Sequence, residues 1–189
     1  MEKKKFKLIY IFSAIKVIFL KIKYGSKLKL DITKVFIHPG ASLNIKDNGS
    51  ITINTDAGRV YLSKGSSVIA SGGVLEIGSG VFFNVNNHIV CHKKITIGAD
   101  CMFGHNVCIF DSDHQYKDPI KNINNQGYIT QETYISPNVW VGAGTIITKG
   151  TFIGNHVVIG ANSVVRGTLD NVSLYAGNPV RFLRKIYEK

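Results

Sequence analysis

A single histidine stands near the start of a polar stretch that carries no aliphatic periodicity. Residues 111–128, DSDHQYKDPIKNINNQGY, are rich in Asn and Asp and indicate a loop. A neutral imidazole has a pKa near working pH and can take a proton from an attacking hydroxyl group, so His114 is a candidate general base. The alternative is a solvated loop histidine. Asp113 or Asp111 could orient the imidazole, or could simply cap the loop.

The remaining histidines and the cysteines do not predict a metal site. His88 and His92 are four residues apart and have no further partner at a ligand spacing. The three cysteines, Cys91, Cys101 and Cys108, have neither metal-ligand spacing nor a disulfide framework. We interpret them as small, reduced core residues.

The element that must position His114 is visible as a six-residue period. Six residues make one flat of four extended residues plus a turn, and three flats close a triangular coil of about 18 residues. Such coils stack with parallel strands around one interior file of aliphatic residues. The file has an early array (Val85, Cys91, Ile97, Phe103, Ile109) and a late one (Ile129, Ile135, Val141, Ile147, Ile153, Ile159, Val165). We expect coils from near residue 35 to about 167, a phase slip near Ser79–Asn84, and an ejected loop at 111–128.

Two stretches then resemble a known family over about residues 75–186. FFNVNNHIV…ITIGADCMFGHNVCIFDSDHQY is similar to the segment of sugar O-acetyltransferases that ends in the catalytic loop, and WVGAGTIITKG with AGNPVR is similar to their last coils. The chain thus resembles the hexapeptide-repeat acyltransferases, nearest to the sugar and polysaccharide O-acetyltransferases. The resemblance implies an all-β fold, a left-handed parallel β-helix, and places the family histidine at His114.

The resemblance also implies an activity: acetyl-CoA-dependent transfer of an acetyl group to a hydroxyl of a saccharide, as in capsule, O-antigen or exopolysaccharide precursors. An N-acetyltransferase acting on a nucleotide sugar and a non-catalytic β-helix scaffold remain alternatives. The family works as a homotrimer with sites between subunits, uses acetyl-CoA as co-substrate and needs no metal.

The implied site residues fall into two groups. The expected acceptor-binding residues are Asn84, Asn86 and His105. The backbone amide at Ala143 would face the thioester oxygen, and arginines would bind the phosphates of coenzyme A. The expected cofactor-binding residues are Trp140, Gly142, Ala143, Gly160, Ala161, Arg166, Arg181 and Arg184.

The net charge of +11 is concentrated at the N-terminus, where residues 1–34 hold ten lysines against Glu2 and Asp31. A nucleic-acid binder carries its charge on the folded body, so nucleic acid is not an expected partner. Residues 1–24 predict a basic apolar helix, too short and interrupted for a membrane span and without a signal-peptide cleavage site. It would pack on the body or a neighbouring subunit, or rest on an anionic membrane. We expect a cytoplasmic protein, in the second case at the inner face of the membrane.

The predicted organisation is therefore an N-terminal basic segment, 1–34, followed by a β-helix domain, 35–189. Residues 168–189 would form a C-terminal cap, with 181–189 as a short helix or tail that closes the open end of the stack.

Overall fold

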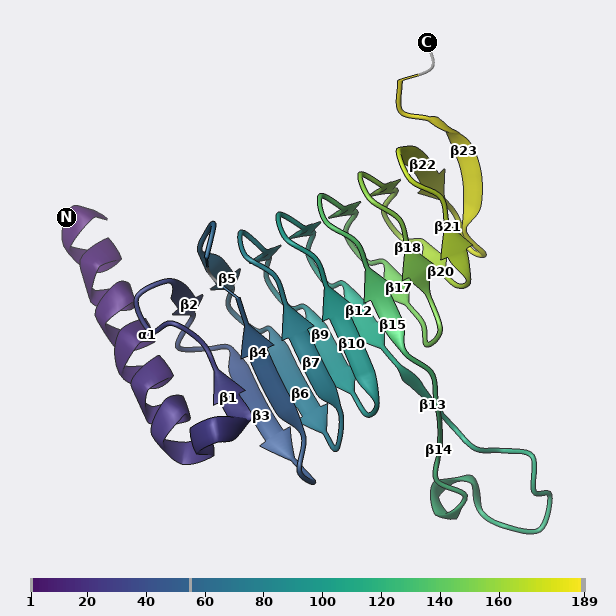
Figure 1. Ribbon diagram of the computed structural model, residues 1–189, viewed down its shortest axis with the longest axis horizontal. Helices are drawn as coiled ribbons and strands as arrows, with labels where there is room; N and C mark the ends of the chain where they lie inside the picture. The colour runs from purple at the N-terminus through teal and green to yellow at the C-terminus, as the bar shows by residue number, and fades with distance from the viewer. Residues whose placement is uncertain (1, 55, 188–189) are drawn as a thin grey trace.

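The computed structural model describes residues 2–54 and 56–187, with side chains from residue 8 onward, and it confirms the predicted fold class. The chain winds into a parallel β-helix of about seven coils, and its hexapeptide repeats give the left hand of that winding (Figure 1). Helix α1 (Glu2–Tyr24) and the short 3-10 helix η1 (Gly25–Lys27) precede the coils.

Three sheets form the sides of the prism, and their strands pair in parallel except for the last strand of the eight-stranded sheet. The seven-stranded sheet contains β1 (Leu28–Lys29), β4 (Ser50–Ile53), β7 (Val74–Ile77), β10 (Lys94–Ile97), β15 (Thr133–Ile135), β18 (Phe152–Ile153) and β21 (Thr168–Leu169). The eight-stranded sheet contains β2 (Val35–Ile37), β5 (Val60–Leu62), β8 (Phe82–Phe83), β11 (Met102–Phe103), β16 (Trp140–Val141), β19 (Val158–Ile159), β22 (Ser173–Ala176) and β23 (Arg181–Lys185). The six-stranded sheet contains β3 (Ser42–Lys46), β6 (Ser67–Ser71), β9 (His88–Cys91), β12 (Cys108–Phe110), β17 (Ile146–Ile147) and β20 (Val164–Val165).

The interior is the aliphatic file that the six-residue period predicts. Every member from Ile135 to Val165 is buried, and lower in the stack Phe83 and Phe103 stack with their ring centroids 4.8 Å apart. Small hydroxyl residues fill the corners, where Thr145 and Ser163 both donate to the carbonyl of Gly160. All three cysteines carry free thiols, and Cys91 and Cys101 are fully buried.

The predicted phase of the lower coils is wrong in detail. The file runs Ile77, Phe83, Ile89 and then jumps eight residues to Ile97, so Val85 is a half-buried corner residue. The slip lies at His92–Lys93, between β9 and β10, and not near Ser79–Asn84. The cause is coil length. Ile77 pairs with Ile97, 20 residues on, whereas Ile135 pairs with Ile153, 18 residues on. Two extra residues between Ile89 and Ile97 shift the register of the pattern.

The predicted loop is present as a projecting β-hairpin between β12 and β15. Strands β13 (Ser112–His114) and β14 (Tyr128–Thr130) pair antiparallel, and η2 (Ile123–Asn125) lies near the tip (Figure 1). Ile129 pairs with Asp113 in this hairpin. It is therefore not part of the interior file, which resumes only at Ile135.

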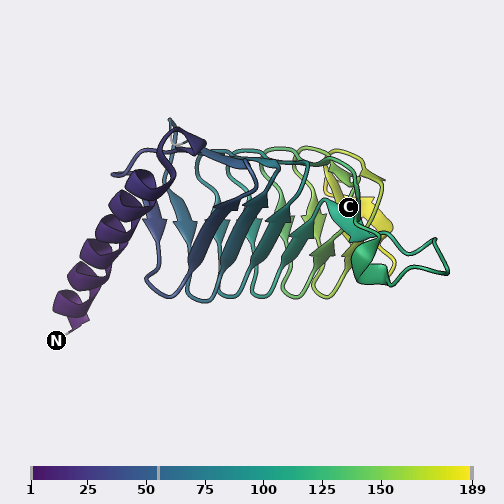
Figure 2. The ribbon, with the colours of Figure 1, turned by 90° about the horizontal axis from the view of Figure 1, so that it is seen from below.

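Both ends of the stack are covered (Figure 2). Strand β1 already pairs with β4, so the coils begin at Leu28 rather than near residue 35, and α1 lies against the first coil. At the other end β23 pairs antiparallel with β22, so a helix over residues 181–185 is the wrong alternative. The last coil exposes unpaired backbone groups, and a returning strand satisfies them.

Candidate functional site

A buried carboxylate clamps the root of the hairpin. Asp111 is fully buried, and its oxygens accept hydrogen bonds from the backbone N–H groups of His92, at 2.8 Å, and Lys93, at 2.7 Å. The thiol of Cys91 lies 3.5 Å from the same carboxylate, and burial together with this negative charge raises the pKa of that thiol. Asp111 therefore ties the start of β13 to the coil below and does not face the imidazole of His114.

His114 stands exposed at the end of β13, beside an open hollow of about 430 Å³. Its ring packs against Tyr128 from the opposite hairpin strand, with centroids 4.6 Å apart, and Tyr128 also stacks on His92 at 4.6 Å. The three rings form a column that packs the hairpin against the body of the β-helix. The hollow is lined by Val90, His92, Phe110, Ser112, Asp113, His114 and Tyr128.

The carboxylate of Asp113 forms an ion pair with a lysine rather than a hydrogen bond with the neighbouring ring of His114. Its carboxylate oxygen lies 2.5 Å from Nζ of Lys149, which comes from the corner between β17 and β18. The side chain of Asp113 is half exposed, and that of Lys149 is largely covered. This ion pair fixes the flank of the hairpin against the coil above it.

We call the corners between the six-stranded and seven-stranded sheets the hairpin edge. It contains the turn at His92–Lys93, the hairpin root at Asp111, the turn with Lys149, and the turn at Arg166–Gly167. The predicted cofactor residue Arg166 therefore lies on the same edge as His114.

The corners between the eight-stranded and six-stranded sheets, residues 84–87, 104–107, 142–145 and 160–163, form a second column that we call the small-residue edge. The amide of Gly144 donates to the carbonyl of His105, and that of Asn162 donates to the carbonyl of Ala143, both at 2.8 Å. Most predicted acceptor and cofactor residues thus stack on one edge: Asn84, Asn86, His105, Gly142, Ala143, Gly160 and Ala161.

The two predicted asparagines shape their own corner. Oδ1 of Asn84 accepts the backbone N–H of Val85 at 2.9 Å, and Asn86 adopts a left-handed backbone with φ of 59°. Asparagine tolerates that conformation better than most residues. Asn86 as a residue is exposed to solvent.

The glycines of this edge are required by coil stacking. A Cβ atom on Gly142 would lie 2.5 Å from the backbone N of Ala161, and one on Gly104 would lie 2.7 Å from that of Ala143. Ala143 and Ala161 themselves are exposed. Within the described part of the chain, neither of their backbone N–H groups has a hydrogen-bond acceptor. The edge therefore offers a narrow row of methyl groups and unpaired amides.

The remaining predicted residues surround these edges. Arg181 pairs with Ala176, next to the top of the small-residue edge, while Arg184 pairs with Leu174 across the eight-stranded sheet. Trp140 points outward from that sheet and is half exposed. In one chain the six-stranded sheet separates His114 from the small-residue edge.

Sequence reasoning missed Tyr128, His92 and Lys149 as neighbours of the candidate base. Tyr128 and His114 face each other only because β13 and β14 pair, and nothing in the polar stretch signals that pairing. Among the residues that the structure describes, no group of three His, Cys, Asp or Glu side chains is placed to hold a metal ion.

Comparisons with known proteins agree with this architecture. Residues 132–167 match the family model described as bacterial transferase hexapeptide (six repeats). The chain is 36% identical over 113 residues to a galactoside O-acetyltransferase of Lactococcus lactis, covering 59% of this chain and 53% of the relative. It is 33% identical over 120 residues to a putative lipopolysaccharide biosynthesis O-acetyl transferase of Escherichia coli, covering 60% and 61%. The chain thus spans between half and two thirds of these relatives.

Among solved structures, a variant of the N-acyltransferase AntD from Bacillus cereus, in complex with dTDP and coenzyme A, superposes with a TM-score of 0.70 at 22% identity. The superposition covers 88% of this chain and 87% of that one. At this level of sequence identity, the structural similarity to AntD is evidence for the fold alone.

Proposed function

We propose that this chain, a hexapeptide-repeat protein, is an acetyltransferase that moves the acetyl group of acetyl-CoA to a hydroxyl group of a saccharide. The observation that carries the proposal is His114, an exposed imidazole held beside an open hollow by a clamped hairpin. The two curated relatives with at least a third of their aligned residues identical both have names that specify O-acetyl transfer.

A trimer would bring the two edges together. The hairpin edge and the small-residue edge flank the same six-stranded sheet. If the hairpin edge of each protomer contacts the small-residue edge of the next, three prisms close a ring in which the six-stranded sheets face the axis. The outward row Cys108, Ile146 and Val164 on that sheet is apolar and only partly covered in one chain, which supports this packing.

The exposed amide row fits the thin arm of coenzyme A. Ala143 and Ala161 offer small side chains and unpaired N–H groups along the edge, and Arg181 stands close to its upper end, where a phosphate would gain a bidentate partner. When bound, acetyl-CoA supplies the acetyl group as a thioester.

His114 then acts on the acceptor. Its imidazole accepts the proton of the saccharide hydroxyl as the oxygen attacks the acetyl carbonyl, and it returns a proton to the sulfur that leaves. The N–H of Ala143 donates to the carbonyl oxygen as negative charge develops there. Tyr128 and Asp113 position the imidazole by packing on its ring and by tying the hairpin to Lys149.

Hydroxyl acceptors are favoured over amines by the two curated relatives, while the AntD likeness rests on the fold alone. We propose a sugar unit of a capsule, O-antigen or exopolysaccharide precursor as the acceptor class. Incubation with acetyl-CoA and a panel of saccharides and nucleotide sugars, followed by mass spectrometry, would identify it and would separate ester from amide products.

The test of the base is His114→Ala, which should lower kcat by about 10² to 10⁴-fold because proton transfer is lost. His156→Ala, at a half-buried histidine on the third edge of the prism, is the control and should keep full activity. Near-normal turnover by His114→Ala would sink the assignment. No shift of the melting temperature by acetyl-CoA would favour the scaffold alternative.

A further inference from the structure

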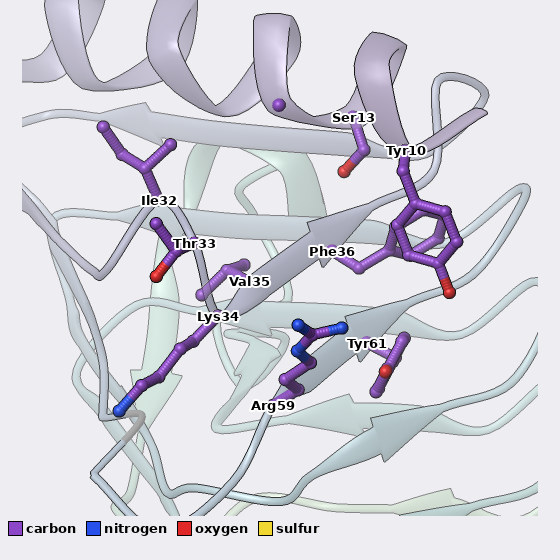
Figure 3. A pocket seen from close by; sticks show the side chains of 10 residues that line it. Tyr10, Ser13, Ile32, Thr33, Lys34, Val35, Phe36, Arg59 and Tyr61 are labelled. Carbon is purple, nitrogen blue, oxygen red and sulfur yellow. The ribbon is translucent and has the colours of Figure 1, made fainter. Parts of the chain in front are cut away.

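Helix α1 presents one face to the first coil. Val17 and Leu20 are buried there, and the hydroxyl oxygen of Ser13 accepts the backbone N–H of Ile37 at 2.8 Å. The ring of Tyr10 packs on Phe36 with centroids 5.1 Å apart. Figure 3 shows Tyr10 and Ser13 pointing from the helix toward Phe36 and its neighbours on the coil. The body of the protein therefore occupies this side of the helix.

The opposite face of α1 is apolar as well. Seven large aliphatic or aromatic side chains recur there at helical spacing, each between 44% and 78% exposed: Leu8, Ile11, Phe12, Ile15, Ile18, Phe19 and Ile22. A surface helix normally turns polar residues to water on the face opposite its core contacts. A continuous apolar row of this length marks a site of interaction.

The charges of the helix avoid this outer face. Lys16, the one charged residue between Lys7 and Lys21, turns to the body, where its ammonium group donates to the carbonyls of Pro39 and Ala41, and burial lowers its pKa. Lys21 also lies toward the body, 3.4 Å from the carbonyl of Leu30. From Leu8 to Ile22 the outer row is therefore uncharged.

Lysines gather at both ends of the row. The sequence places Lys3, Lys4, Lys5 and Lys7 before it, and Lys23, Lys27 and Lys29 are exposed after it. Glu2 and Asp31 are the two acidic residues of this region. An apolar row flanked by cations complements a surface that has an apolar interior and anionic groups at its boundary.

We propose that the outer face of α1 docks in the plane of an anionic lipid bilayer. The apolar row, about 21 Å long at 1.5 Å per residue, would enter the boundary between headgroups and acyl chains, and the flanking lysines would contact lipid phosphates. Among the described residues, no helix is long and apolar enough to cross a membrane, in keeping with a helix that lies flat. This docking does not depend on the acetyl-transfer reaction.

The docked helix would set the orientation of the whole prism. Because α1 covers the first coil, the stack would rise away from the lipid, with the C-terminal cap at the far end (Figure 2). The hairpin follows the fourth coil, so at a strand spacing of about 4.8 Å its root stands roughly 14 Å above the first coil.

The test is sedimentation of the full chain with lipid vesicles of two compositions. One is phosphatidylcholine alone, and the other is phosphatidylcholine with about 30% phosphatidylglycerol, which makes the surface anionic. The wild type should sediment with the anionic vesicles and lose binding as salt rises. The affinity of the triple variant Phe12→Ser, Ile15→Ser, Phe19→Ser for the anionic vesicles should be at least about tenfold lower than that of the wild type.

Two further variants separate the causes. Ile120→Ser with Ile123→Ser removes exposed apolar side chains from the hairpin tip and should bind vesicles like the wild type. Lys23→Gln with Lys27→Gln should weaken binding to the anionic vesicles and flatten its salt dependence. Circular dichroism melts of each variant check that the fold is retained.

Three results would overturn the proposal. The first is a wild type that sediments with neither vesicle, and the second is a folded triple variant that binds as tightly as the wild type. The third is a triple variant with a smaller assembly mass by light scattering while the wild type ignores lipid, because the outer face would then cover a second copy of this chain.

Discussion

The carboxylate of Asp111 holds the hairpin in place without contacting the histidine that the hairpin carries. The carboxylate accepts hydrogen bonds from two backbone N–H groups of the preceding coil. The backbone carbonyl of Asp111 accepts the backbone N–H of Gln131, where the hairpin returns to the stack. Three links thus converge on one buried residue. The position of the His114 imidazole therefore depends on Asp111, at the root of the hairpin that carries it.

Asp111→Asn tests this clamp. The amide keeps the size of the side chain but turns one acceptor into a donor that faces one of the two N–H groups, so we expect the free energy of unfolding to fall by about 1–3 kcal/mol. Urea denaturation measures it. Asp113→Asn, which removes the half-exposed ion pair with Lys149, should cost less than about 1 kcal/mol. Equal costs for the two variants would contradict the clamp.

At this scale the sequence allowed His114 to be chosen as the candidate base, because its position at the start of the polar stretch is a local feature. The partners of its ring could not be predicted. Tyr128 is 14 positions away along the chain, and His92 belongs to the previous coil. Neither contact follows from spacing, since both depend on how the hairpin folds back.

At the scale of elements, the coil corner is where the backbone of one turn meets the backbone of the next. Gly142 has no positive φ to explain it, and the nearest atom to a Cβ placed there is the backbone N of Ala161. The glycine is therefore required by the distance between coils, about 4.8 Å, and not by its own conformation.

Gly142→Ala should lower the free energy of unfolding by about 1–3 kcal/mol, because the added methyl group can be accommodated only by moving the next coil. Gly40→Ala is the matched control. Its Cβ would meet only side-chain atoms at 3.4 Å, and the expected change is within about 0.5 kcal/mol. Thermal or urea unfolding monitored by circular dichroism compares the two, and a harmless Gly142→Ala would refute the stacking argument.

The six-residue period predicted these elements well where coils hold 18 residues and less well where they hold 20. From Ile135 to Val165 each flat has the same length, so the file is regular in sequence and in space. Below the hairpin, β9 and β10 are four residues each, and the step from Ile89 to Ile97 is eight residues instead of six. A longer step changes the phase of the sequence pattern without changing the stack of coils, and a periodicity count cannot distinguish the two.

For the whole molecule, the division of the predicted site between two edges favours an assembly. Ile146 lies on the six-stranded sheet, beside Cys108 and Val164. If the sheets face a threefold axis, a charge there would be buried against its own copies.

Ile146→Glu should therefore convert a trimer into monomers and abolish acetyl transfer together with it, as light scattering and a turnover assay would show. Phe152→Glu places the same charge on the outer face of the seven-stranded sheet, at a side chain of similar exposure, and should leave the mass unchanged. A trimer that survives Ile146→Glu and dissociates with Phe152→Glu would move the interface to the other sheet.

The hairpin leaves the stack and returns to it without displacing any strand. Ile95 pairs with Thr133 and Ile97 with Ile135, so the coil above continues the parallel ladder as if the excursion were absent. Such an excursion behaves as an interchangeable module on a fixed frame. Residues 112–130 could be exchanged for those of another member of this architecture while the interior stayed intact, and the choice of acceptor could diversify independently of the scaffold that presents it.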